Sequence, residues 1–213
     1  MSKNFLTLLS ITLVLTTGCH SAKIETATTS AAPAAAGNEP AYKGGPGPTD
    51  AELREAIIRN YEDAVVIDNS RAAPFLVGDF NGDNSEDIAI VVKPGEGKLS
   101  KLNSEYANWI LEDPRQPVHI RDLKSRPAPV TISGKDSLLA VIHGVKSEGW
   151  RSAIAKQTYL LKNAVGESFE TQSSRQSNGA KSRFRGDVIR EKLDGTDGMI
   201  YFTGAKYAWH PII

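Results

Sequence analysis

Residues 78–92 read Gly78-Asp79-Phe80-Asn81-Gly82-Asp83-Asn84-Ser85-Glu86-Asp87-Ile88-Ala89-Ile90-Val91-Val92. The first part is rich in Asp, Asn and Gly, residues that favour tight turns because their side chains bond the local backbone or permit unusual backbone angles. The second part is apolar and β-branched, which predicts a buried strand. The sequence therefore predicts a polar loop that leads directly into a strand of the core.

The oxygen-bearing side chains of this loop alternate along the chain, an arrangement that suits a hard cation. Ca²⁺ takes about six to eight oxygen ligands, and acids at every second residue of a turn can direct several oxygens to one centre. Carboxylates packed together without a cation repel one another. We therefore expect a structural Ca²⁺ site formed by Asp79, Asn81, Asp83, Ser85 and Asp87. The alternative is a metal-free turn in which the same side chains bond the backbone.

The run Gly-Asp-Phe-Asn-Gly-Asp, followed by Asp87 and an apolar strand, is similar to the calcium loops of FG-GAP and VCBS repeats. The resemblance implies side-chain ligation by Asp79, Asn81, Asp83 and Asp87, with the Ser85 carbonyl between them. Asn84 stands where the repeats usually carry Gly, at a position that needs a positive φ, and Asn is the best substitute there. The motif occurs once in the chain, whereas a propeller needs several blades, so we do not expect a full β-propeller.

The N-terminus has the organisation of a targeting segment. Lys3 supplies an early positive charge, residues 5–15 are apolar or small, and Leu15-Thr16-Thr17-Gly18-Cys19 follows. The apolar run is too short to span a bilayer comfortably as a mature helix. The pattern resembles a bacterial lipoprotein signal peptide of residues 1–18, although Thr16 stands where that family prefers Leu. An ordinary secretory peptide is the alternative.

Cys19 is the only cysteine of the chain, so an internal disulfide is impossible. A lone thiol in an oxidising compartment is a liability unless it is used. We therefore predict lipid attachment at Cys19 and membrane association through that lipid, in a bacterial cell envelope. His20 follows the cysteine. Outer-membrane lipoproteins of Gram-negative bacteria usually carry a residue other than Asp at this position, and this sequence resembles them there.

Residues 19–48 are dominated by Ala, Thr, Pro and Gly, which offer little apolar surface to offset chain entropy. We expect a disordered tether there, and a single globular domain over residues 49–213. Formal net charge is 0, from 25 Lys and Arg against 25 Asp and Glu. That balance gives no basic bias for nucleic acid.

Within residues 49–213 the apolar pattern predicts an α+β domain, with one or two helices packed on an antiparallel-rich sheet. Thr49-Asp50-Ala51-Glu52 forms a capping box for a helix that carries Leu53, Ile57 and Tyr61 on its apolar face. Leu102, Tyr106, Trp109 and Ile110 also fall at helical spacing and predict a second helix. Predicted strands are residues 88–92, 137–142, 158–161, 184–189 and 199–202, with a C-terminal hairpin to 206–209 and a polar loop over 168–181.

The sequence carries no zinc-ligand spacing, nucleophile elbow or phosphate-binding loop. His143 ends an apolar strand and is expected to be a structural histidine. We therefore expect a non-enzymatic module that binds a protein or a glycan. The alternatives are an envelope hydrolase with carboxylates such as Glu148, Asp187 or Glu191 in a cleft, or a small periplasmic inhibitor.

Overall fold

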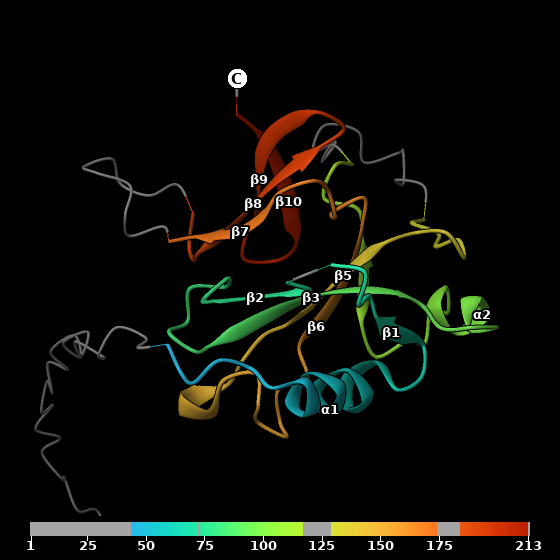
Figure 1. The fold of residues 1–213 in the computed structure, drawn as a ribbon, viewed down its shortest axis with the longest axis horizontal. Helices are drawn as coiled ribbons and strands as arrows, with labels where there is room; N and C mark the ends of the chain where they lie inside the picture. The colour runs from blue at the N-terminus through green and yellow to red at the C-terminus, as the bar shows by residue number, and fades with distance from the viewer. Residues whose placement is uncertain (1–43, 72, 117–128, 174–183, 213) are drawn as a thin grey trace, which may run out of the picture. The chain divides into compact units, whose positions relative to one another are not determined.

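The computed structural model describes residues 44–71, 73–116, 129–173 and 184–212. The predicted signal peptide, Cys19 and most of the predicted tether lie outside the described residues. The described chain combines helices with two antiparallel-rich sheets, and neither sheet closes into a barrel or propeller (Figure 1). The expected α+β class is confirmed.

Helix α1, Asp50–Tyr61, begins at the predicted capping box. The Thr49 amide donates to Glu52 Oε2 at 2.8 Å, and the Glu52 amide donates to the Thr49 hydroxyl at 3.3 Å. These bonds satisfy amides that the first helical turn leaves without partners. The described chain has two further short helical segments, the α-helix α2, Leu99–Leu102, and the 3₁₀-helix η1, Lys146–Glu148.

The first sheet holds six strands in the order β1-β3-β5-β6-β4, and β2 pairs with β3 on the same edge as β1. All of its pairs are antiparallel except β4–β6, which is parallel. Its strands are β1 (Val65–Ile67), β2 (Phe75–Gly78), β3 (Asp87–Pro94), β4 (Ile110–Glu112), β5 (Leu138–Ile142) and β6 (Thr158–Lys162).

The second sheet is fully antiparallel, in the order β10-β9-β8-β7. The predicted C-terminal hairpin is confirmed as β9–β10, with Tyr207 opposite Phe202. The strands of this sheet are β7 (Phe169–Gln172), β8 (Val188–Leu193), β9 (Thr196–Phe202) and β10 (Tyr207–Pro211).

Strands β3, β5 and β6 lie between two hydrophobic clusters, with α1 on one face of the first sheet and the second sheet on the other (Figure 1). In β3, Ile88 and Ile90 pack on the α1 side, whereas Ala89 and Val91 pack on the side of the second sheet. A strand buried on both faces reads as a continuous apolar run, because both alternating sets of side chains are covered. This explains the composition of residues 88–92 and 138–142.

The predicted second helix is wrong. Helix α2 ends at Leu102, and Ile110 begins β4. The Asn103 side chain explains the early end, because its Nδ2 donates to the Leu99 carbonyl and its Oδ1 accepts from the Ile132 amide. Tyr106 is 94% exposed, so its place in the helical spacing was accidental.

Two further boundaries differ from the prediction. Strand β8 begins at Val188, not at residue 184, because residues 185–187 contact the acidic loop instead of joining the sheet. The expected polar loop over 168–181 contains strand β7 at its start, where Thr171 pairs with Ile189. The rest of that expected loop, from residue 174, lies outside the described residues.

Candidate functional site

The acidic loop, residues 79–86, connects β2 to β3 at the point where Gly78 pairs with Asp87. Gly82 and Asn84 adopt positive φ values of 76° and 67°. Few residues other than Gly enter this region, and Asn enters it more readily than most. The expectation of a positive φ at Asn84 is therefore confirmed.

Asp79 organises the first half of the loop. Its Oδ1 accepts hydrogen bonds from the amides of Gly82 at 2.8 Å and Asp83 at 3.0 Å, and its Oδ2 accepts from the Asn84 amide at 3.0 Å. Burial raises the pKa of the Asp79 carboxyl, and these three amides partly offset that effect. The loop backbone is thus folded around one buried carboxyl group.

Asp87 holds the end of the loop and is fully buried. Its Oδ2 accepts from the amides of Phe80 at 2.8 Å and Asn81 at 3.1 Å, and its Oδ1 accepts from the Gly144 amide at 2.6 Å. Burial raises the pKa of Asp87 well above its ordinary value, and the nearby carboxylates of Asp83 and Asp79 raise it further. A cation at this place would remove both penalties.

Of the remaining predicted ligands, Asp83 is exposed and Asn81 is half-buried, whereas Ser85 is buried. Asp83 Oδ1 accepts from the Ser85 amide at 2.7 Å, and Asp83 Oδ2 accepts from Asn81 Nδ2 at 2.9 Å. Asn81 Oδ1 accepts from the Asp83 amide at 2.9 Å. The five predicted ligands thus lie in the acidic loop and at the first residue of β3, and Asp79, Asp83 and Asp87 bond its backbone.

The donor chemistry of the loop fits Ca²⁺, since every predicted ligand offers oxygen. As placed in the described chain, however, no three Asp, Glu, His or Cys side chains converge into a metal-holding group. Four carboxylate oxygens each accept one of the hydrogen bonds given above: Asp79 Oδ2, Asp87 Oδ1 and both oxygens of Asp83. A carboxylate oxygen has about two lone-pair sites, so each of the four keeps one for a cation. These oxygens are the ones that would hold the ion.

The acidic loop also forms a junction with the second sheet, through the segment that precedes β8. The Asp187 amide donates to the Asp79 carbonyl at 2.7 Å, and the Asp79 amide donates to Asp187 Oδ2 at 3.1 Å. The contact is close, because a Cβ built on Gly186 would lie 2.2 Å from the Asp79 carbonyl oxygen. Arg185-Gly186-Asp187 is therefore a packing segment in this fold.

Glu86, next to the predicted ligands, forms a second buried polar contact that sequence reasoning missed. Its Oε1 accepts from Trp150 Nε1 at 2.8 Å and from Arg151 Nη1 at 2.6 Å, and its Oε2 accepts from the Gly45 amide at 3.0 Å. Gly45 belongs to the last residues of the predicted tether, so contacts with the domain begin before Thr49. The partners lie 41 to 65 residues away in sequence, and no local pattern indicates them.

His143 is buried as expected and belongs to an aromatic cluster between the two sheets. Its Nε2 lies 2.8 Å from the Tyr207 hydroxyl, and its ring contacts Tyr159 and Phe202. Burial lowers the pKa of His143 to about 4. A neutral imidazole enclosed by aromatic rings packs the core between the two sheets.

The carboxylates named for the hydrolase alternative come from two parts of the chain, the 3₁₀-helix η1 and the region of β8. Glu148 lies in η1, Asp187 bonds the Asp79 amide, and Glu191 is buried in β8. Asp187 and Glu191 are four residues apart along extended chain, about 13 Å, which exceeds the separation of catalytic glycosidase carboxylates, about 5–9.5 Å. No observation therefore favours the hydrolase over a binding module.

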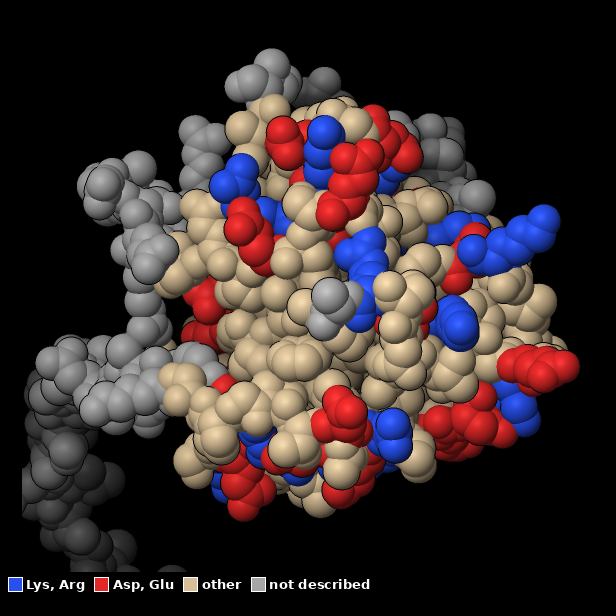
Figure 2. Space-filling view, viewed as in Figure 1, with Lys and Arg blue, Asp and Glu red and all other residues tan. Residues whose placement is uncertain are grey.

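Comparison of the chain with protein-family models, curated proteins and solved structures finds no match. The resemblance of the acidic loop to FG-GAP and VCBS loops therefore stays a prediction. Within the described residues, no helix has both the length and the apolar composition needed to cross a bilayer. The face seen in Figure 2 carries interleaved basic and acidic side chains, with apolar and neutral surface between them.

Proposed function

We propose that this protein is a lipid-anchored component of the bacterial cell envelope whose globular domain binds Ca²⁺ at the acidic loop and acts as a non-enzymatic binding module. One observation carries the metal part of the proposal. Asp79, Asp83 and Asp87 influence one another electrostatically, and two of them are buried with raised pKa values. A hard cation is the ligand that relieves this repulsion.

The role of the ion would be structural. The backbone of Asp79 already bonds Asp187, so an ion held by the Asp79 carboxylate would strengthen the connection between the β2–β3 loop and the second sheet. Because the fold fixes the backbone of the acidic loop and unfolding releases it, an ion bound there would stabilise the fold. The ion would thereby hold the two sheets more rigidly against each other.

The anchoring part of the proposal rests on the sequence. Residues 1–18 resemble a lipoprotein signal peptide, Cys19 is the only thiol, and the composition of residues 19–48 suits a tether. A tether of this kind spans roughly 5–6 Å times the square root of its length, on the order of 30 Å. Such a length would hold the domain near the membrane surface, at the outer membrane if the host is Gram-negative.

Calcium binding is tested directly by titrating metal-stripped protein, full length and in mild detergent, with CaCl₂ in a calorimeter. We expect one site per chain in the wild type and loss of that site in Asp83→Asn, which keeps the size of the side chain. Asp197→Asn is the matched control, because Asp197 is an exposed aspartate of β9 outside the loop. Equal binding by all three proteins, or heat from none of them, would refute the calcium site.

A further inference from the structure

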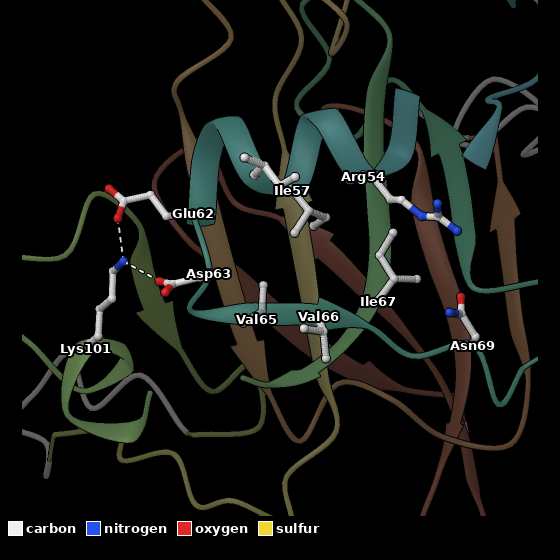
Figure 3. Close-up of a pocket in the computed structure, with 10 residues that line it drawn as sticks. Arg54, Ile57, Glu62, Asp63, Val65, Val66, Ile67, Asn69 and Lys101 are labelled. Carbon is white, nitrogen blue, oxygen red and sulfur yellow. Dashed lines mark hydrogen bonds and ion pairs between the residues drawn. The ribbon is translucent and has the colours of Figure 1, made fainter. Parts of the chain in front are cut away.

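A groove with a volume of about 750 Å³ lies between helix α1 and strand β1 (Figure 3). Its apolar lining comes from both elements, as Ile57 and Ile58 of α1 and Val65, Val66 and Ile67 of β1. Two of these side chains are unusually exposed for their type, Ile58 at 64% and Val66 at 44%. Exposed apolar side chains gathered along a groove are typical of a surface that a partner covers.

Strand β1 forms one end of the strand order of the first sheet, and it bonds only β3 among the described strands. The Gly95 amide donates to the Ala64 carbonyl at 2.8 Å, and the Asp68 amide donates to the Val91 carbonyl at 2.9 Å. Along a strand, the backbone amide and carbonyl groups of successive residues point alternately to one edge and to the other. The amide and carbonyl groups of Val65 and Ile67 therefore face away from β3, along the free edge.

A free edge next to an apolar groove restricts the kind of occupant. An acyl chain could fill the apolar space, but it has no donor or acceptor for the backbone groups of Val65 and Ile67. An extended peptide supplies both, since its backbone would continue the sheet and its side chains on the face of α1, at every second position, would contact Ile58. The geometry thus favours a peptide over a lipid.

The charges at the two ends of the groove differ. At one end, Lys101 pairs with Glu62 and Asp63, and Asp63 also pairs with Lys98, so the charges balance. At the other end, Arg54 extends from α1 toward Ile67 and Asn69 (Figure 3). Arg54 has no ion pair with any other described residue. This unpaired cation is complementary to an acidic group on the occupant.

We propose that the α1–β1 groove binds an extended peptide segment of another protein by strand addition to β1, with alternating apolar side chains and one acidic side chain facing Arg54. The inference rests on the proposed role as a binding module, and it specifies the partner class and the surface. It does not rest on the calcium loop, since no residue of that loop lines the groove.

The test begins with the full-length protein in mild detergent, on which a library of displayed random dodecapeptides is selected. We expect an enriched consensus with apolar residues at every second position and one Asp or Glu. A synthetic peptide of that consensus is then titrated against variants by fluorescence anisotropy. Ile58→Glu should weaken binding roughly tenfold, as removal of a central contact does. Arg54→Gln should weaken it about two- to fivefold, the usual value of an exposed ion pair.

The matched control is Ile154→Glu, because Ile154 is also 64% exposed but lies outside the groove. A scan of N-methylated peptides gives an independent readout. If the peptide adds as a strand, methylation should weaken binding about tenfold at alternate positions only, those whose amides bond Val65 or Ile67.

The proposal would be overturned by equal loss in Ile58→Glu and Ile154→Glu, by no alternation in the N-methyl scan, or by selection of no peptide at all. Concentration-dependent dimers that Ile58→Glu disrupts would also overturn it, because a second copy would then occupy the groove. Asp83→Asn separates this inference from the calcium proposal. That variant should bind the peptide normally, whether or not the loop takes up Ca²⁺.

Discussion

The amide of Asp187 donates a 2.7 Å hydrogen bond to the carbonyl oxygen of Asp79, and the Asp79 amide donates to the Asp187 carboxylate at 3.1 Å. This reciprocal pair joins the start of the acidic loop, in the first sheet, to the segment that enters the second sheet. The stretch for which we propose calcium binding is therefore also a structural connection between the sheets. The predictions below test both properties.

Gly186→Ala should destabilise the protein by about 1–3 kcal/mol, the usual cost of forcing an extra group into a packed site. The new Cβ would lie 2.2 Å from the Asp79 carbonyl oxygen and 2.6 Å from the Gly82 amide nitrogen, so backbone would have to move. Urea unfolding monitored by circular dichroism measures the change. Gly47→Ala is the control, because a Cβ there meets no atom within 4 Å. Equal stability of the two variants would contradict the described junction.

Asp87→Asn should cost about 1–3 kcal/mol, the range for leaving a buried donor without a partner. The two carboxylate oxygens of Asp87 accept three amides, from Phe80, Asn81 and Gly144. An asparagine amide group would replace one oxygen with a donor that faces another donor. Thermal unfolding in EDTA measures the apo protein alone. An unchanged melting temperature would show that this bonding pattern is not formed.

Glu191→Gln should change how stability depends on pH. Burial raises the pKa of Glu191 to about 7 from 4.5, and its carboxylate oxygens lack hydrogen bonds of normal geometry among the described residues. The folded protein therefore holds the Glu191 proton at pH values where the unfolded chain has released it. The stabilisation that comes from holding this proton is complete below about pH 4.5 and is lost as pH rises to about 7.

We expect the Glu191 contribution at low pH to be about 3 kcal/mol, the free energy that corresponds to a rise in pKa from 4.5 to about 7. Urea unfolding at pH 5 and pH 8 measures it as a difference between wild type and Glu191→Gln. The glutamine variant should be relatively more stable at pH 8 than at pH 5. Parallel pH profiles for the two proteins would show that Glu191 titrates normally.

Cys19→Ser should release the protein from the membrane fraction. If Cys19 carries the lipid, palmitate supplied to an expressing bacterial host should label the wild type, whereas the variant should remain unlabelled. Lipid anchors with two acyl chains hold proteins firmly at membranes, so the wild type should resist extraction by high salt. Labelling of the variant, or its retention in membranes, would contradict anchoring through this cysteine.

Local patterns in the sequence were sufficient for much of the fold. The capping box at Thr49 and the buried runs at residues 88–92 and 138–142 were predicted because their signals lie within a few residues. The second helix was predicted wrongly, since the bonds from Asn103 that end α2 include one to Ile132, 29 residues away. Helical spacing alone carries no information about such a contact.

The candidate site was predictable only in part, for the same reason. The positive φ of Asn84 follows from the loop sequence itself, and the proposed ligand set rests on that sequence alone. The contacts of the loop with Asp187 and Gly144, and of Glu86 with Trp150, join segments 57 to 108 residues apart. The α1–β1 groove depends on which strand ends the sheet, and strand order does not follow from a single sequence.

Thermal unfolding of the full-length protein, first with excess EDTA and then with millimolar Ca²⁺, tests the central claim most directly. Ligand at about 100 times its dissociation constant stabilises a protein by about 2.7 kcal/mol, roughly 5–10 °C for a domain of this size. We predict an increase of that size for the wild type and for Asp197→Asn, and none for Asp83→Asn. An unchanged wild-type melting temperature, or an equal increase in Asp83→Asn, would contradict the calcium loop.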